Sequence, residues 1–98
     1  MGAAAVDIAR RLSRRLGGLS FGSPVAFVYD PTDYASASHE AYLRRFAGRG
    51  AEVLMLGMNP GPFGMVQTGV PFGEVGVVRD WLGIHEPVRR PPREHPRR

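Results

Sequence analysis

The sequence turns on residues 57–72, which read Gly-Met-Asn-Pro-Gly-Pro-Phe-Gly-Met-Val-Gln-Thr-Gly-Val-Pro-Phe. They follow directly on a short apolar run at 53–56, Val-Leu-Met-Leu. A buried strand that ends at a loop rich in glycine and proline places that loop at the carboxyl edge of a sheet. Open α/β folds bind their ligands at this edge. We therefore expect the functional site here, with Asn59 as the polar side chain at the strand end.

Working outward from this loop, the pattern predicts helices at 3–16, 39–46 and 75–82 and strands at 25–29 and 52–57. Helix 3–16 would bury an apolar stripe, and Ser38 would cap helix 39–46. The alternation predicts an α/β fold, the start of a parallel-sheet α/β/α layer with about two strands and three helices. Because a typical sheet has about four to six strands, we expect the chain to be part of something larger. The stripe of helix 3–16 comprises Ala5, Ile8, Ala9, Leu12 and Leu16.

The net charge of +4 belongs to the C-terminal segment. We divide the chain into a folded part at 1–86 and a Pro/Arg-rich basic tail at 87–98, which we expect to be extended or disordered. A basic tail suits polyanions, and it is equally typical of a solvated end. The basic helix at 3–16 leaves similar alternatives open: contact with a phosphate backbone or membrane surface, or simple packing on the core. The chain has no cysteine, so we expect no disulfide and no thiolate metal site.

Several residues of the loop could carry chemistry. Glycine and proline together give a shaped segment, but neither a Walker A sequence nor the dinucleotide-binding glycine spacing is present. The amide of Asn59 can orient a water molecule, or it can merely close a turn. Phe63 and Phe72 can stack on a nucleobase, or they can belong to the core. Met58 and Met65 are more typical of gap-fillers than of ligand contacts.

Three segments carry a resemblance to a known family. They are residues 57–65 (Gly-Met-Asn-Pro-Gly-Pro-Phe-Gly-Met), 67–75 (Gln-Thr-Gly-Val-Pro-Phe-Gly-Glu-Val) and 78–84 (Val-Arg-Asp-Trp-Leu-Gly-Ile). They closely resemble the single-strand-selective monofunctional uracil-DNA glycosylases. The resemblance covers most of the chain from about residue 21 onward. It implies a uracil-DNA glycosylase-like fold and an enzyme that starts base-excision repair by removing uracil, or oxidised pyrimidines such as 5-hydroxymethyluracil, from DNA without strand cleavage.

The resemblance also implies roles for individual residues. Asn59 would hold the hydrolytic water, Phe72 would stack on the flipped base, and Met58, Gly61 and Phe63 would line the base pocket. No metal or other cofactor is implied. We expect a monomer that acts on damaged DNA inside the cell, in the nucleus of a eukaryote or the cytoplasm and nucleoid of a bacterium, without membrane contact. Arg89, Arg90 and Arg93 are the candidate DNA contacts of the tail.

Two elements of the family pattern are missing from these 98 residues. They are the histidine segment that donates to the leaving base and the asparagine that reads the uracil edge. We therefore expect little or no glycosylase activity from the 98 residues alone. The alternatives are a non-catalytic nucleic-acid-binding module, which would use the basic tail and the N-terminal helix, and a remnant without function.

Overall fold

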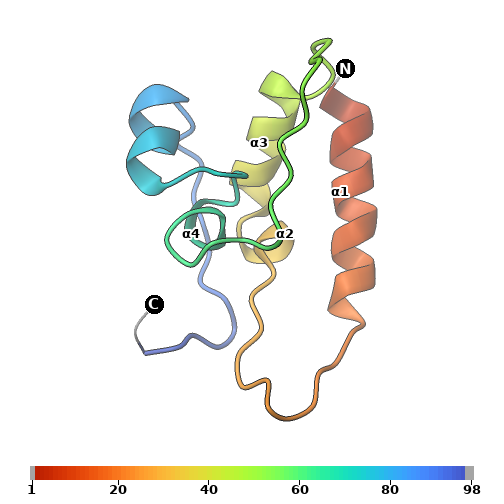
Figure 1. The fold of residues 1–98 in the computed structure, drawn as a ribbon, viewed down its shortest axis with the longest axis vertical. Coiled ribbons are helices and arrows are strands. Elements are labelled where there is room, and N and C mark those ends of the chain that lie inside the picture. The colour runs from red at the N-terminus through yellow and green to blue at the C-terminus, as the bar shows by residue number, and fades with distance from the viewer. Residues whose placement is uncertain (1, 97–98) are drawn as a thin grey trace.

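The computed structural model describes residues 2–96 and consists of short helices joined by long irregular segments (Figure 1). The longest helix, α1, spans Gly2–Gly17, and α3 spans Ser36–Phe46. Two single-turn helices, α2 (Pro31–Tyr34) and α4 (Met65–Thr68), lie between the longer elements. A π-helical turn, η1, spans Val77–Trp81.

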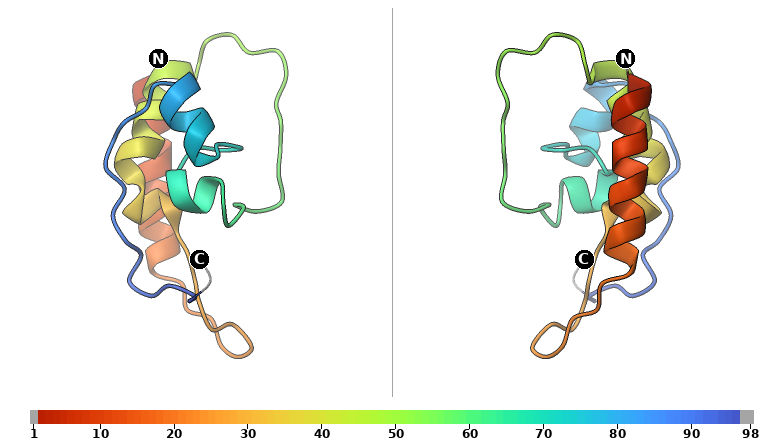
Figure 2. Two further views of the ribbon diagram at one scale, coloured as in Figure 1. Left: turned by 90° about the vertical axis from the view of Figure 1, so that its left-hand side faces the viewer. Right: turned by 90° about the vertical axis from the view of Figure 1, so that its right-hand side faces the viewer.

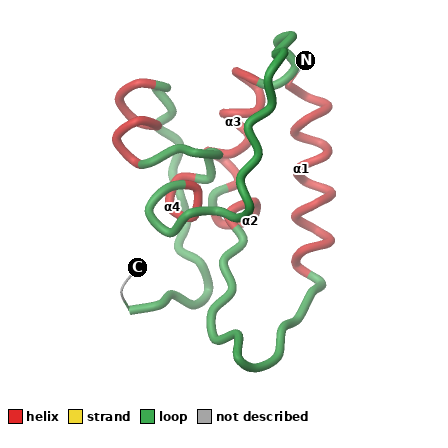
Figure 3. The backbone as a smooth tube through the Cα atoms, viewed as in Figure 1, coloured by secondary structure: helices red, strands yellow, loops and turns green. Residues whose placement is uncertain are grey.

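The predicted α/β class is wrong, because residues 2–96 contain no strand (Figure 3). Residues 25–29 and 52–57 have no regular secondary structure. Residues 53–56 are between 71% and 88% exposed. They lie on the long loop between α3 and α4, which extends away from the helices (Figure 2). A strand exists only through hydrogen bonds to a neighbouring strand. Apolar composition predicted such a neighbour, and the described part of the chain supplies none.

The helix predictions fared better. Helix 3–16 is confirmed as α1, and helix 39–46 as the second half of α3. Ser38 is not the cap: it lies buried within α3, which begins after Ala35 without a side-chain cap. Helix 75–82 becomes a helical start followed by η1, and Gly83 ends it with a φ of 68°.

The predicted stripe of α1 is wrong in part. Ala5, Ala9 and Leu16 are half-buried, whereas Ile8 and Leu12 are 58% and 47% exposed, and the buried residues of the helix, which packs on α3, are Gly2 and Val6. A Cβ on Gly2 would lie 2.4 Å from the Cα atom of Arg44, so the two helices are in close contact at this point. A glycine at the contact lets the two helix backbones come closer together than the large side chains of the stripe, Ile8 and Leu12, would allow.

The core is small and lies where α3 meets the segment around η1. Val70, Val78 and Ile84 are its buried members, and Ala41, Tyr42 and Leu82 pack against them. Two polar contacts join α4 to the corner between α2 and α3: the Tyr34 hydroxyl donates to the Val66 carbonyl, and Nδ1–H of His39 donates to the Gly69 carbonyl over 2.8 Å. These contacts place the C-terminal end of α4 on the helical layer.

The residues of the predicted tail that the structure describes, 87–96, run back along the helices without helix or strand of their own (Figure 1). The backbone N–H of Arg89 donates to the Tyr34 carbonyl over 3.0 Å, and its guanidinium lies 3.2 Å from Asp33 Oδ1. Pro91 is buried. Residues 97 and 98 of the predicted tail lie outside the described residues.

Gly69 and Gly50 provide a matched test of the packing at this corner. Both have left-handed backbones, with φ of 75° and 71°. A Cβ at position 69 would lie 2.8 Å from both Cβ and O of Ala35, whereas one at position 50 meets nothing within 4 Å. We expect Gly50→Ala to lower the free energy of unfolding by about 1–2 kcal/mol through backbone strain alone, and Gly69→Ala to lower it further. Equal losses in urea denaturation would contradict the close contact.

A second test concerns the two ion pairs of Glu40, of which the one with Arg10 joins α1 to α3 and the one with Arg44 lies within α3. Glu40 lies 2.8 Å from Arg10 and 3.1 Å from Arg44, and the hydrogen bond from Arg10 is the main cause that holds the pKa of Glu40 below its ordinary value. The folded state therefore binds fewer protons than the unfolded state, and the stabilisation is lost as pH falls through the lowered pKa.

We accordingly expect Glu40→Gln to be less stable than the parent chain at neutral pH, with the difference shrinking below about pH 4. Urea denaturation of both proteins across this range measures the difference. A difference that stays constant with pH would mean that the pair contributes nothing through the charge of Glu40.

Candidate functional site

A buried hydroxyl organises the turn that follows α4. Oγ1 of Thr68 donates to the Gly73 carbonyl over 2.6 Å and accepts from the backbone N–H of Val70 over 3.2 Å. The N–H of Gly73 in turn donates to the Val70 carbonyl over 2.9 Å. A Cβ on Gly73 would lie 2.6 Å from Cγ2 of Val78. This turn is therefore held by the hydrogen bonds of the Thr68 hydroxyl and by the packing of Gly73 against Val78 of the core.

Phe72 stands at the tip of this turn with its ring 65% exposed. Its φ is 57°, and it is the one residue other than glycine with positive φ in the part of the chain that the structure describes. Such a backbone costs on the order of 1–3 kcal/mol and persists only where the surroundings enforce it. Cζ of the ring lies 3.4 Å from the position that a Cβ on Gly57 would occupy. The turn thus presents a phenyl face to solvent beside the Gly57 backbone.

The other predicted site residues lie on the exposed part of the loop. Met58 and Phe63 are exposed, and Asn59 is exposed, with Nδ2 donating over 3.2 Å to the carbonyl of the next residue, Pro60. A Cβ on Gly61 would meet nothing within 4 Å. The structure therefore brings Phe72 to the loop at Gly57, and it leaves Met58, Asn59, Gly61 and Phe63 without an enclosing wall.

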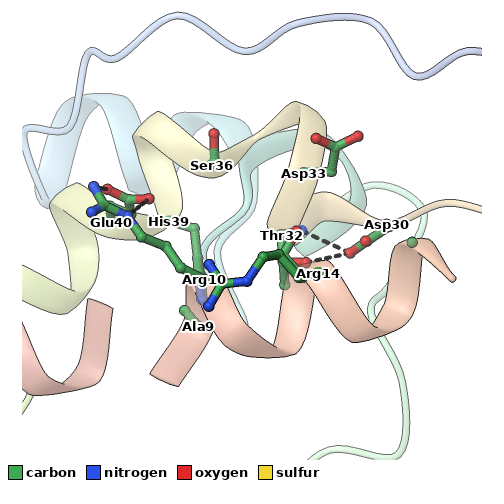
Figure 4. A pocket seen from close by; sticks show the side chains of 11 residues that line it. Ala9, Arg10, Arg14, Asp30, Thr32, Asp33, Ser36, His39 and Glu40 are labelled. Carbon is green, nitrogen blue, oxygen red and sulfur yellow. Dashed lines mark hydrogen bonds and ion pairs between the residues drawn. The ribbon is translucent and has the colours of Figure 1, made fainter. Parts of the chain in front are cut away.

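Two pockets of the molecule are lined by other residues. A cavity of about 460 Å³ lies between α1 and the α2–α3 corner, and Figure 4 shows Arg10 against Glu40 and Thr32 against Asp30 at its rim. A second pocket of about 290 Å³ lies between α3, α4 and η1 and is lined by Ser38 and Gln67, among others. Neither pocket includes a predicted base-binding residue.

The arginines predicted to bind DNA differ in how far they are engaged. Arg89 donates to the backbone and carboxylate of Asp33. The guanidinium of Arg93 lies 5.2 Å from the centre of the Phe27 ring, a cation–π contact. Arg90 is exposed, and its side chain forms no ion pair with any residue between 2 and 96. Two of the three predicted contacts therefore also hold the tail segment on the body of the protein.

Sequence reasoning did not find the residues that shape the turn, above all Thr68, Gly69 and Gly73. The pair Thr68-Gly69 at the end of a short helical turn was an available signal, because glycine is the usual C-terminal residue with left-handed backbone. Residues 2–96 contain no group of three or more His, Cys, Asp or Glu side chains that could hold a metal ion. None of the described helices combines the length and apolar composition needed to span a bilayer.

Comparison with known proteins shows first the class and then the particular kind of protein that the chain resembles. No family model matches it. Curated proteins that match it are named as uracil-DNA glycosylases. Over 88 residues the chain is 59% identical to the single-strand selective monofunctional uracil DNA glycosylase of Mus musculus and 58% identical to that of Bos taurus. These residues are 90% of this chain and 32% of each relative. The resemblance to these glycosylases is therefore confirmed over 90% of the chain, which spans about a third of the length of the curated relatives it matches.

The strain at Phe72 can be measured by comparing two variants of the same residue. Phe72→Ala and Phe72→Gly both remove the ring, but only glycine adopts a positive φ without steric cost. We expect Phe72→Gly to be more stable than Phe72→Ala by about 1 kcal/mol in urea denaturation. At a residue with ordinary φ the order is reversed, since glycine has the greater entropy when unfolded. A more stable alanine variant would therefore contradict the left-handed backbone.

Proposed function

We propose that the protein acts as a DNA repair glycosylase, which hydrolyses the N-glycosidic bond between uracil and deoxyribose. The observation that carries this proposal is the exposed Phe72 ring, held by a strained turn against the loop of Asn59, within a sequence 59% identical to a uracil DNA glycosylase. The substrate would be uracil, or an oxidised pyrimidine such as 5-hydroxymethyluracil, in single- or double-stranded DNA.

The reaction needs a placed water and a stabilised leaving base. The bond between the anomeric carbon and the base nitrogen breaks, the base takes the bonding electron pair, and the water oxygen attaches to the anomeric carbon. One proton of this water stays on the new hydroxyl group of the sugar, and the other neutralises the departing base anion. Positive charge develops on the sugar before attack, so positioning of the water matters more than a strong base. Asn59 supplies this positioning: its Nδ2 donates a hydrogen bond to the Pro60 carbonyl, and its Oδ1 can accept a hydrogen bond from the water.

Phe72 recognises the base after it leaves the stack. Enzymes that act on a base within DNA must extrude it and hold it in a pocket. Stacking on an aromatic ring contributes about 1–3 kcal/mol per base, and a ring fixed by its backbone loses little freedom on binding. Met58, Gly61 and Phe63 would complete the pocket, and Arg89, Arg90 and Arg93 would contact phosphates. We propose an intracellular monomer that needs no cofactor.

The 98 residues alone should release little uracil. The loop around Asn59 is open to solvent, and residues 53–56 beside it are exposed, so water competes for every contact with the base. The hydrogen bond from the Asn59 side chain to the Pro60 carbonyl also favours one alternative function. In this alternative the protein is a nucleic-acid-binding module without catalysis, and the amide only closes a turn. A chimaera separates these two functions.

The chimaera carries this chain in place of the matched third of the Mus musculus relative. We expect it to release uracil from a single-stranded oligonucleotide, and we expect Asn59→Ala to lower the rate by about a hundredfold or more while DNA affinity changes little. Gln67→Ala is the matched control, because Gln67 is a second amide of the loop that donates to a backbone carbonyl, that of Pro62 at 3.3 Å.

Three outcomes would count against the proposal. Full activity of the Asn59→Ala chimaera removes that residue from the mechanism. Equal losses in the Asn59 and Gln67 variants point to general damage of the loop. A parent chimaera that binds DNA without releasing uracil supports the non-catalytic alternative.

A further inference from the structure

Helix α1 carries four arginines, of which one, Arg10, forms an ion pair with a described residue; the other three form what we call the arginine flank. Arg10 is held by both carboxylate oxygens of Glu40, at 3.1 and 2.8 Å. Arg11, Arg14 and Arg15 are exposed and have no hydrogen bond or ion pair to any described residue. Asp7 is the single acidic residue of the helix. Within two helical turns the flank therefore carries three guanidinium groups without an ion pair in the described part of the chain, against the single carboxylate of Asp7.

The direction of this flank follows from the packing of α1. The helix contacts α3 through Gly2 and Val6, which are its buried residues. Residues spaced three or four apart lie on one side of a helix, so Arg11 lies next to Arg14 and Arg15. The large apolar residues Ile8 and Leu12 follow on the neighbouring side. Arg11 and Arg15 thus lie on the side of α1 opposite its buried residues, whereas Arg14 borders the cavity between α1 and the α2–α3 corner (Figure 4).

We propose that this arginine flank, Arg11, Arg14 and Arg15, binds the phosphate backbone of DNA outside the base-binding loop. The choice of DNA as the polyanion rests on the proposed function. Arginines one turn apart are separated by about 5.4 Å along the helix axis, and successive phosphates of one strand by about 3.4 Å along the axis of B-form DNA, so neighbouring arginines can reach different phosphates. Guanidinium groups also match phosphate in charge and in paired hydrogen-bond geometry.

An acidic membrane surface is the competing partner, and the composition of the helix disfavours it. An interfacial helix buries a broad apolar face rich in large residues. Here the exposed apolar stripe has only Ile8 and Leu12 as large residues well exposed to solvent within α1. The arginines lie on one side of this stripe. On its other side the stripe borders the face of α1 that packs on α3. The contribution of the flank to DNA binding would be independent of sequence and sensitive to salt.

The test measures binding of the 98-residue chain to a labelled single-stranded oligonucleotide without uracil, by fluorescence anisotropy across a salt series. Each phosphate contact on single-stranded DNA contributes about 0.7 to the slope of log affinity against log salt. We expect the double variant Arg11→Gln/Arg15→Gln to lower that slope by about 1.4. The charge-matched control is Arg44→Gln/Arg79→Gln, in which both exposed arginines are engaged by Glu40 and Asp80, and it should keep the slope.

Three results would overturn the proposal. An unchanged slope in the flank variant removes α1 from the interface, and equal reductions in both double variants show a response to net charge alone. Sedimentation with vesicles of phosphatidylserine and phosphatidylcholine is run in parallel. If the chain sediments with the vesicles but does not bind the oligonucleotide, the flank binds membranes and the DNA interface is rejected. Because the oligonucleotide contains no uracil and nothing is cleaved, these outcomes are independent of whether the chimaera excises uracil.

Discussion

The close contact between the backbone of Gly69 and Ala35 is the constraint on which the rest of this structure depends. A left-handed residue without a side chain lets the end of α4 approach within van der Waals distance of the α2–α3 corner. The carbonyl of Gly69 then accepts a hydrogen bond from His39, and the carbonyl of Val66 accepts one from Tyr34. Once α4 is held there, Val70 enters the core and the turn that ends at Gly73 is fixed.

This constraint divides the central loop into two parts with different physical character. The part after Gly64 is shaped by hydrogen bonds and core contacts, and it presents Phe72 on a strained backbone. The part before it, from residue 52 to Gly61, makes few contacts and exposes a row of apolar side chains. The ring proposed to stack on a base, Phe72, thus lies on the fixed turn, whereas the side chain proposed to hold the water, Asn59, lies on the less constrained part.

The sequence predicted local features well and long-range ones poorly. Helical periodicity located α1 and most of α3, because this signal acts within a few residues. The run at 53–56 was misread, since apolar side chains show that a segment needs a partner but not where the partner lies. The stripe of α1 was misread in part for a related reason: small residues packed against α3, while the larger residues Ile8 and Leu12 stayed exposed.

The site shows the same division. Asn59 and Phe72 stand out because of the motif that they share with the glycosylase family, but no pattern indicated that Phe72 would have a positive φ. That angle follows from Thr68, Gly69 and Gly73 acting together through contacts with Ala35 and Val78. A sequence reader sees each of these residues as ordinary turn chemistry. Their combined effect becomes visible only when α4 is placed on the helices.

The most direct test of this account is amide hydrogen exchange of the 98-residue chain, followed by NMR. The N–H groups of Gly69 and Gly73 donate to Met65 and Val70 over 2.8 and 2.9 Å, and we expect them to exchange slowly because opening requires the loss of core contacts. The N–H groups of residues 53–56 should exchange as fast as those of an unfolded chain. Slow exchange at 53–56, or fast exchange at Gly69 and Gly73, would contradict the division of the loop into a fixed turn and an open segment.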